Sequence, residues 1–128
     1  MAKQRNQLIG TPENDILTGT SRKNMVYGRG GDDIISSKAG VYRVWGEDGN
    51  DQFVTVNDGI GHMKIMDLEI GETITFCGCP ATQIEQRGKN AWIIKGSDVK
   101  AIVADANATD FVLDFSNRII TMVTDTLI

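Results

Sequence analysis

The chain has 128 residues, the usual size of one domain, and its formal net charge of −4 argues against nucleic acid as a partner. No apolar run approaches the roughly 18–20 residues that a membrane span needs, so none is expected. Fourteen glycines against two prolines indicate a repeated need for backbone that only glycine adopts easily. We expect residues 1–128 to form a single domain.

Residues 1–9 are expected to be a short lead-in to that domain. The first residues, Met1-Ala-Lys-Gln-Arg-Asn-Gln7, include two basic side chains but no apolar segment after them. A cleaved secretory signal is therefore not expected. With so short a lead-in, no catalytic domain is expected before the rest of the chain.

Residues 10–54 fall into five lines of nine residues, which begin at positions 10, 19, 28, 37 and 46. The first residue is glycine in four of the five lines. The eighth is always large and apolar: Leu17, Val26, Ile35, Val44 and Phe53. The sixth is Asp15, Asn24, Asp33, Tyr42 and Asp51. This pattern predicts glycine-rich turns alternating with short strands, whose single inward side chains form a core only when the coils stack as a solenoid.

Two other interpretations of these turns are weaker. Asp-Gly and Gly-Gly pairs also form ordinary hairpins, but a β-sandwich would not hold a strict nine-residue phase over five lines. An EF-hand loop counted from Asp48 would need glycine at its sixth position and glutamate at its twelfth. Those positions are Phe53 and Gly59.

The lines resemble the calcium-binding nonapeptide of RTX (repeat-in-toxin) proteins, Gly-Gly-x-Gly-x-Asp-x-apolar-x. Residues 27–35 and 45–53 are close matches, and residues 9–17 match more loosely because Glu13 stands where glycine is usual. The resemblance implies an all-β fold. We expect a right-handed parallel β-roll of about five nonapeptide coils over 10–54 and a β-rich C-terminal cap over 55–128.

In a β-roll, alternate lines lie on the same side, so the lines with Asp15, Asp33 and Asp51 should stack while those with Asn24 and Tyr42 form an opposite side without calcium. The resemblance implies that each ion lies between two stacked turns and shares their aspartates. That predicts about two Ca²⁺ ions, since calcium takes six to eight oxygen ligands from carboxylates and carbonyls. The candidate metal ligands are Asp15, Asp33, Asp51, Gly28, Gly30, Gly31, Gly46, Asp48, Gly49, Asn14, Asp32 and Asn50. Asn14, Asp32 and Asn50 are interpreted as turn-formers first and ligands second.

Stacked strands lie about 4.8 Å apart, so the aspartates would repel one another by on the order of 3 kcal/mol per adjacent pair without a cation. We therefore expect the roll to be disordered or loose in the absence of calcium. The affinity should lie in the roughly 10⁻⁴–10⁻³ M range of extracellular modules.

Two further groups in the repeats are candidates for contact with a partner. Arg22, Lys23 and Lys38 should lie on the calcium-free side, where they serve solubility or contact an acidic partner. Tyr27 and Trp45 are 18 residues apart and should stack on an outer face of the roll. There they either pack under the C-terminal region or form a patch for self-association or a protein partner.

After Val54 the nine-residue phase ends. Residues 64–76 resemble the segment that follows RTX repeats, although Leu68 and Thr73 depart from its Asp-Phe-x-x-Gly-x-Asp pattern. Strands are expected at 91–96, 99–103 and 110–115, and they should cover the open end of the roll. Cys77 and Cys79 are expected to be free thiols, because so close a spacing rarely suits a disulfide. A zinc half-site with His62 is the alternative.

The last residues, Asp125 to Ile128, resemble the uncleaved C-terminal signal of type I export, with a final strand as the alternative interpretation. His62 is the only histidine and has no partners for a catalytic set, so no enzyme is expected. The resulting hypothesis is a secreted calcium-binding protein, extracellular or at the cell surface. The alternative is a structural module for surface decoration, adhesion or a virion, and a cytoplasmic or virion-associated location stays open.

Overall fold

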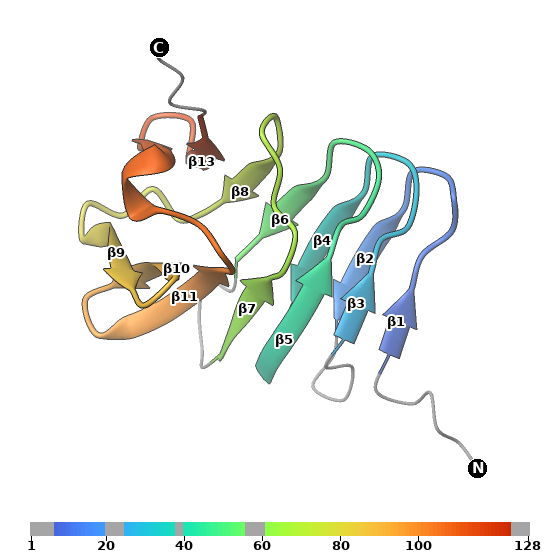
Figure 1. Cartoon of the computed structure of the whole chain (residues 1–128), viewed down its shortest axis with the longest axis horizontal. Helices are drawn as coiled ribbons and strands as arrows, with labels where there is room; N and C mark the ends of the chain where they lie inside the picture. The colour runs from blue at the N-terminus through green and yellow to red at the C-terminus, as the bar shows by residue number, and fades with distance from the viewer. Residues whose placement is uncertain (1–6, 20–24, 38–39, 56–60, 124–128) are drawn as a thin grey trace.

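A computed structural model describes residues 7–19, 25–37, 40–55 and 61–123, and in these residues the fold is all-β (Figure 1). In spatial order, the first sheet contains β1 (Gln7–Ile9), β3 (Met25–Tyr27), β5 (Gly40–Trp45), β7 (Gly61–Ile65), β11 (Asp98–Val103), β10 (Asn90–Lys95) and β9 (Thr82–Arg87). The second contains β12 (Phe111–Asp114), β13 (Ile119–Met122), β8 (Thr73–Thr75), β6 (Gln52–Val54), β4 (Ile34–Ser37) and β2 (Ile16–Gly19). One short 3₁₀-helix, Ala108–Asp110, precedes β12.

The first half of the chain is a parallel β-solenoid. The chain alternates between the sheets, so that each strand pairs in parallel with the second strand after it. Leu17, for example, pairs with Ile35, and Ile35 pairs with Phe53. One turn of the solenoid therefore takes two nine-residue lines. The predicted β-roll is confirmed, but the five lines are half-turns of a solenoid of about three turns and not five complete coils.

Burial establishes the register of the repeat. The eighth residue of every line points into the core, and Ile35, Val44 and Phe53 are fully buried. Ile34, one residue earlier than Ile35, is 38% exposed. The lines that begin at 10, 28 and 46 are therefore in the structural register, whereas the windows 27–35 and 45–53 begin one residue too early.

Tyr42 has a different role from the one its position in the repeat suggests. It lies within the six-residue strand β5 and is only 1% exposed. A β-carbon added at Gly19 would collide with the Tyr42 ring, so this glycine is needed to let the aromatic side chain fill the interior. Tyr42 is a core residue of the roll.

The parallel ladders extend beyond Val54. Strand β7 pairs in parallel with β5, and β8 pairs in parallel with β6, so these two strands add a further turn. The C-terminal strands then cover this end (Figure 1). The meander β9–β10–β11 continues the first sheet, and the β12–β13 hairpin continues the second. Strands were expected in the regions of β10, β11 and β12, and all three are present.

Candidate calcium site

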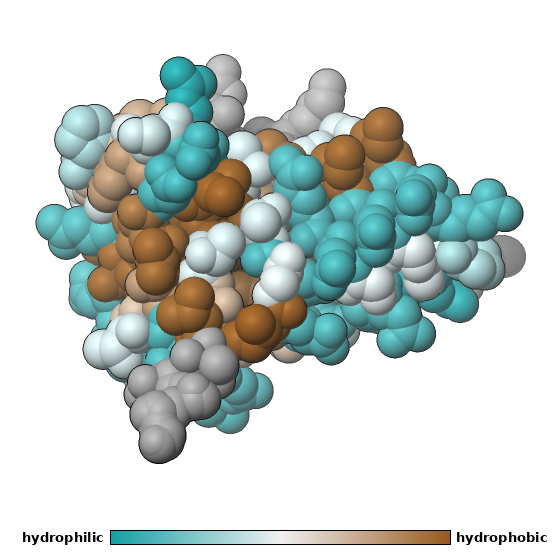
Figure 2. Space-filling model, turned by 90° about the horizontal axis from the view of Figure 1, so that it is seen from above, coloured by the Kyte–Doolittle hydropathy of each residue, from teal (hydrophilic) through white to brown (hydrophobic). Residues whose placement is uncertain are grey.

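Three glycine-rich turns, 10–15, 28–33 and 46–51, stack along one edge of the roll (Figure 1). Backbone hydrogen bonds hold them in register at their ends. Gly28 N–H donates to the Trp45 carbonyl at 2.7 Å, and Gln52 N–H donates to the Asp33 carbonyl at 2.8 Å. Seen from this edge, hydrophilic residues cover most of the roll, with a few apolar ones along one margin, while apolar residues gather over the C-terminal end (Figure 2).

The fourth position of each turn contacts the backbone of the turn before it. A β-carbon at Gly49 would collide with the Gly31 carbonyl, and one at Gly31 would collide with the Glu13 carbonyl. Both glycines also have positive φ, 97° and 82°. Within residues 7–19, no earlier turn contacts Glu13, so no such collision is seen at the fourth position of the first turn.

The sixth-position aspartates of the second and third turns are buried, and only one oxygen of each accepts a hydrogen bond. Asp33 is 1% exposed and Asp51 2%. Asp15 N–H donates to Asp33 Oδ1, and Asp33 N–H donates to Asp51 Oδ1, both at 2.8 Å. The Oδ2 atoms of Asp33 and Asp51 are buried without a hydrogen-bond partner. A buried oxygen of this kind is costly unless a donor or a cation compensates it.

Backbone carbonyls converge on these carboxylates. The β-carbon position of Gly28 lies 2.7 Å from Asp33 Oδ2 and 2.8 Å from the Gly46 carbonyl oxygen. The same position of Gly10 lies 2.8 Å from Asp15 Oδ2 and 2.7 Å from the Gly28 carbonyl oxygen. Glycine at the first position thus leaves room where the carboxylate of one turn meets the carbonyl of the next.

This donor set suits calcium. In the described part of the chain, no three His, Cys, Asp or Glu side chains gather as a metal site. An ion at the turns would therefore depend on carbonyl oxygens as well as aspartates, and calcium accepts both. The unpartnered Oδ2 atoms of Asp33 and Asp51 and the converging carbonyls fit such an ion.

The first turn differs because Asp15 is already satisfied. The Thr11 N–H donates to Asp15 Oδ2 at 2.6 Å, and the Thr11 hydroxyl lies 3.0 Å from both carboxylate oxygens. Asp15 is also only half-buried. Asp33 and Asp51 thus have the stronger need for a cation.

The fifth-position side chains link neighbouring turns. Asp32 N–H donates to Asn14 Oδ1 at 2.7 Å, and Asn50 N–H donates to Asp32 Oδ1 at 2.8 Å. All three are exposed, as is Asp48. One oxygen each of Asn14 and Asp32 is therefore engaged in forming the turns. Gly30, another candidate, lies against Pro12 of the preceding turn.

Two residues of the site, Asp67 and Glu72, were not predicted from the sequence. The fully buried Glu72 accepts hydrogen bonds from Asp51 N–H at 3.2 Å and Glu69 N–H at 2.9 Å. Asp67 accepts from Gly46 N–H and Glu47 N–H, both at 2.9 Å. They form a fourth turn over 67–72, which is displaced by 21 residues from the third instead of 18. Its signal was the Gly71-Glu72 pair, which matches the Gly-x-Asp of the repeat only loosely.

The buried carboxylates are difficult to ionise without a cation. Burial raises the pKa of Asp33 and of Glu72. Burial, together with the negative charges of Glu72 and Asp33, raises the pKa of Asp51 to about 8. A bound cation would stabilise the ionised forms, which links ion binding to the stability of the roll.

The predicted aromatic stack is present on the outer face of the first sheet. The Tyr27 and Trp45 rings are nearly parallel, with centroids 4.8 Å apart, and Ile9 pairs with Tyr27 in the same ladder. The predicted basic side (Arg22, Lys23 and Lys38), Asn24 and the tail Asp125–Ile128 lie outside the described residues.

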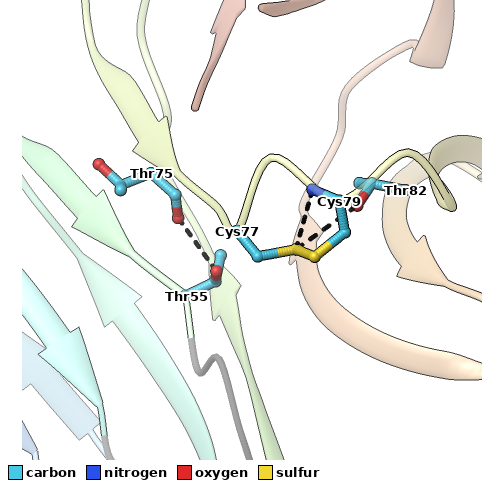
Figure 3. Close-up of a disulfide and its surroundings, with 5 residues drawn as sticks. All are labelled: Thr55, Thr75, Cys77, Cys79 and Thr82. Carbon is cyan, nitrogen blue, oxygen red and sulfur yellow. Dashed lines mark hydrogen bonds between the residues drawn. A yellow bond between two sulfur atoms is a disulfide. The ribbon is translucent and has the colours of Figure 1, made fainter. Parts of the chain in front are cut away.

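The prediction of free thiols is wrong. Cys77 and Cys79 form a disulfide in the loop between β8 and β9 (Figure 3). Gly78 has a φ of 74°, and this tight turn places the two Cα atoms 5.2 Å apart, within the usual range for a disulfide. With both sulfurs bonded to each other, the zinc half-site with His62 has lost its thiolates.

The fold and the stacked turns define a calcium-binding β-roll. In agreement, residues 9–41 match the family model of the RTX calcium-binding nonapeptide repeat (four copies). This part of the chain therefore carries RTX calcium-binding repeats, as the sequence resemblance indicated. No curated protein and no solved structure matches the chain. The described part of the chain contains no helix with the length and apolar character of a membrane span.

Proposed function

We propose that this protein is a secreted, non-catalytic calcium-binding protein whose roll folds on about two Ca²⁺ ions and serves as a scaffold or cell-surface component. The observation that carries the proposal is the pair of buried, unpartnered carboxylate oxygens, Asp33 Oδ2 and Asp51 Oδ2. Without a cation they destabilise the roll. Calcium binding and folding are then one equilibrium.

One ion belongs between the turns of Asp15 and Asp33, and the second between those of Asp33 and Asp51. The carbonyls of Gly28 and Gly46, which converge on the aspartates, support this assignment. The second site is the better formed of the two, because Asp33 Oδ2 and Asp51 Oδ2 are both unpartnered, whereas Asp15 Oδ2 accepts a hydrogen bond from Thr11 N–H. Calcium supplies positive charge there, while the chain supplies the oxygen cage.

A location outside the cell has two supports. RTX repeats are typical of secreted or surface proteins, and the Cys77–Cys79 disulfide is a bond that persists in oxidising compartments. A chain that needs calcium to fold would stay loose in calcium-poor cytosol and fold outside. We propose type I export directed by Asp125–Ile128.

The test is a calcium titration of the metal-free protein followed by far-UV circular dichroism, with magnesium as the control ion. Sub-millimolar to millimolar calcium should raise the β signal. Asp33→Asn should abolish this rise, whereas Asp98→Asn, which removes an exposed charge from the cap, should leave it unchanged. A protein that is fully folded without calcium would contradict the proposal.

The alternative function is that of a structural interaction module in surface decoration, adhesion or a virion. The observation in its favour is the Tyr27–Trp45 stack beside the 42%-exposed Ile9, a set of large side chains on one outer face. Deleting Asp125–Ile128 separates the two functions. Lost export with normal folding supports secretion, and lost folding supports the module.

A further inference from the structure

The Cys77–Cys79 disulfide is poorly placed for a structural role. The two cysteines are separated by one residue, so the bond joins no distant segments and closes a very short loop. The stabilisation that a disulfide confers by constraining the unfolded chain grows with loop length and is small here. The roll end of this loop is already held by the backbone, since Thr55 donates through its N–H and hydroxyl to the Thr75 carbonyl (Figure 3).

The two sulfurs lie in different surroundings. Cys77 follows the buried Phe76 and packs against the hydrophobic core. Its Sγ lies 3.1 Å from the Cys79 N–H, which donates to it, and 4.0 Å from the Thr82 hydroxyl (Figure 3). Cys79 precedes the exposed Pro80. Hydrogen-bond donors around Cys77 Sγ would stabilise a thiolate at that atom.

We propose that Cys77-Gly78-Cys79 is a thiol–disulfide exchange site for low-molecular-weight thiols, with Cys79 as the sulfur that is attacked and Cys77 as the leaving thiolate. The leaving group with the more stable thiolate departs faster, which selects Cys77. The inference goes beyond calcium binding and depends on a different part of the chain.

The exchange balances as two substitutions. An external thiolate attacks Cys79 Sγ, a sulfur–sulfur bond forms to it, and the Cys77–Cys79 bond breaks with its electron pair on Cys77, which then takes up a proton from water. A second external thiolate attacks the external sulfur of this mixed disulfide and releases the Cys79 thiolate. Two thiols are oxidised to one external disulfide, and the protein disulfide is reduced to a dithiol.

The side chain of Arg118 shapes the site. A β-carbon at Gly78 would lie 2.9 Å from Arg118 Cγ and 3.1 Å from the Phe115 carbonyl oxygen, so glycine lets the loop lie against the aliphatic part of this side chain. The two cysteines carry out the exchange.

The experiment treats the oxidised, calcium-loaded full chain with reduced glutathione, blocks free thiols with N-ethylmaleimide and locates both adducts by peptide mass spectrometry. Glutathione should be found on Cys79 about tenfold more often than on Cys77, the effect of a hydrogen bond or two at the leaving sulfur. Equal labelling, labelling at Cys77, or no adduct would overturn the proposal.

Single-cysteine variants provide the matched comparison. Cys79→Ala keeps the backbone N–H that faces Cys77 Sγ, and Cys77→Ala leaves Cys79 alone. The rate of maleimide labelling against pH should give the lower thiol pKa for Cys77, and Thr82→Val should raise that pKa. Circular dichroism should show the calcium-loaded roll intact after reduction. A roll that unfolds on reduction would show that the disulfide is structural and would refute the exchange site.

Discussion

Asp33 and Asp51 are linked across two turns of the roll, because the backbone N–H of Asp33 donates to Asp51 Oδ1 at 2.8 Å. The same bond joins Asp15 to Asp33 one turn earlier, and Glu72 accepts it from Asp51 one turn later. One oxygen of each carboxylate thus accepts a backbone hydrogen bond that holds neighbouring turns together. The other oxygen of Asp33 and of Asp51 is free for an ion.

The fourth-position glycine should be the most sensitive single position in the turns. Gly49→Ala introduces a collision with Gly31 in addition to an unfavourable positive φ. Gly71→Ala has a similar φ of 100° but meets only Asn50 Oδ1, at an ordinary contact distance of 3.5 Å, so it is the matched control. In urea unfolding with saturating calcium, the control should cost about 1 kcal/mol and Gly49→Ala at least about 3 kcal/mol. Equal losses would show that the turns are not packed this closely.

Relief of backbone strain should stabilise the second turn. Arg29 is an exposed non-glycine residue with a φ of 69°. Arg29→Gly removes the cost of about 1 kcal/mol that a non-glycine residue has in the left-handed conformation. The greater backbone entropy of glycine in the unfolded state offsets part of this gain. The free energy of unfolding should therefore rise by about 0.5 kcal/mol. Arg29→Ala keeps the strain and should bring no gain. The urea midpoints of the three proteins make the comparison, and a gain in the alanine variant would assign the effect to lost charge.

Without calcium, the roll should be more stable at acid than at neutral pH. Burial raises the pKa of Asp51 to about 8 in the folded protein, against 3.8 as the ordinary value. Between these values the folded state binds more protons than the unfolded state, so the free energy of unfolding falls as pH rises towards 8. The raised pKa of Asp33 and of Glu72 acts in the same direction.

The measurement is the far-UV β signal at pH 5 and pH 8 in buffer freed of calcium by chelating resin. The signal should be lower at pH 8 than at pH 5, and Asp51→Asn should reduce this difference. Saturating calcium should remove the dependence, since the cation stabilises the ionised carboxylates. A calcium-free protein that is equally stable at both pH values would be inconsistent with buried carboxylates in the turns.

Glu72 should stabilise the fourth turn without being essential for calcium. Glu72→Ala leaves the backbone N–H groups of Asp51 and Glu69 without their acceptor, a loss of about 2 kcal/mol. Glu69→Ala changes an exposed side chain of the same turn and is the control. Calorimetric titration should show a larger loss of calcium affinity for Asp33→Asn than for Glu72→Ala. The reverse order would make Glu72 a principal ligand.

The sequence predicted the structure correctly where the same residue types recur every nine residues. The inward positions of Ile35 and Phe53, the stacking of Tyr27 on Trp45 and the parallel β-roll all follow from the nine-residue phase, because each repeat places equivalent atoms in equivalent surroundings. The departure at Glu13 was visible in the sequence.

The sequence did not reveal contacts between residues that do not follow the nine-residue repeat. Glu72 takes the place of an aspartate three residues late, because the connection between β6 and β7 is three residues longer than in the repeat. Tyr42 was assigned to a turn by its position, but its large ring is more favourable in the interior above Gly19. The Cys77–Cys79 bond depends on the positive φ of Gly78, a local conformation that residue spacing does not specify.

By itself, then, the sequence determined the repeating unit, its apolar and acidic positions, and through them the class of fold and the preference for calcium. Only the tertiary structure decided which carboxylate oxygens lack a hydrogen-bond partner, that the turn of Glu72 follows the three repeat turns, and that Cys77 and Cys79 form a disulfide. A periodic sequence specifies local conformation and the neighbours one period away. The burial of a carboxylate and the closing of a bond depend on contacts that form only when the whole chain has folded.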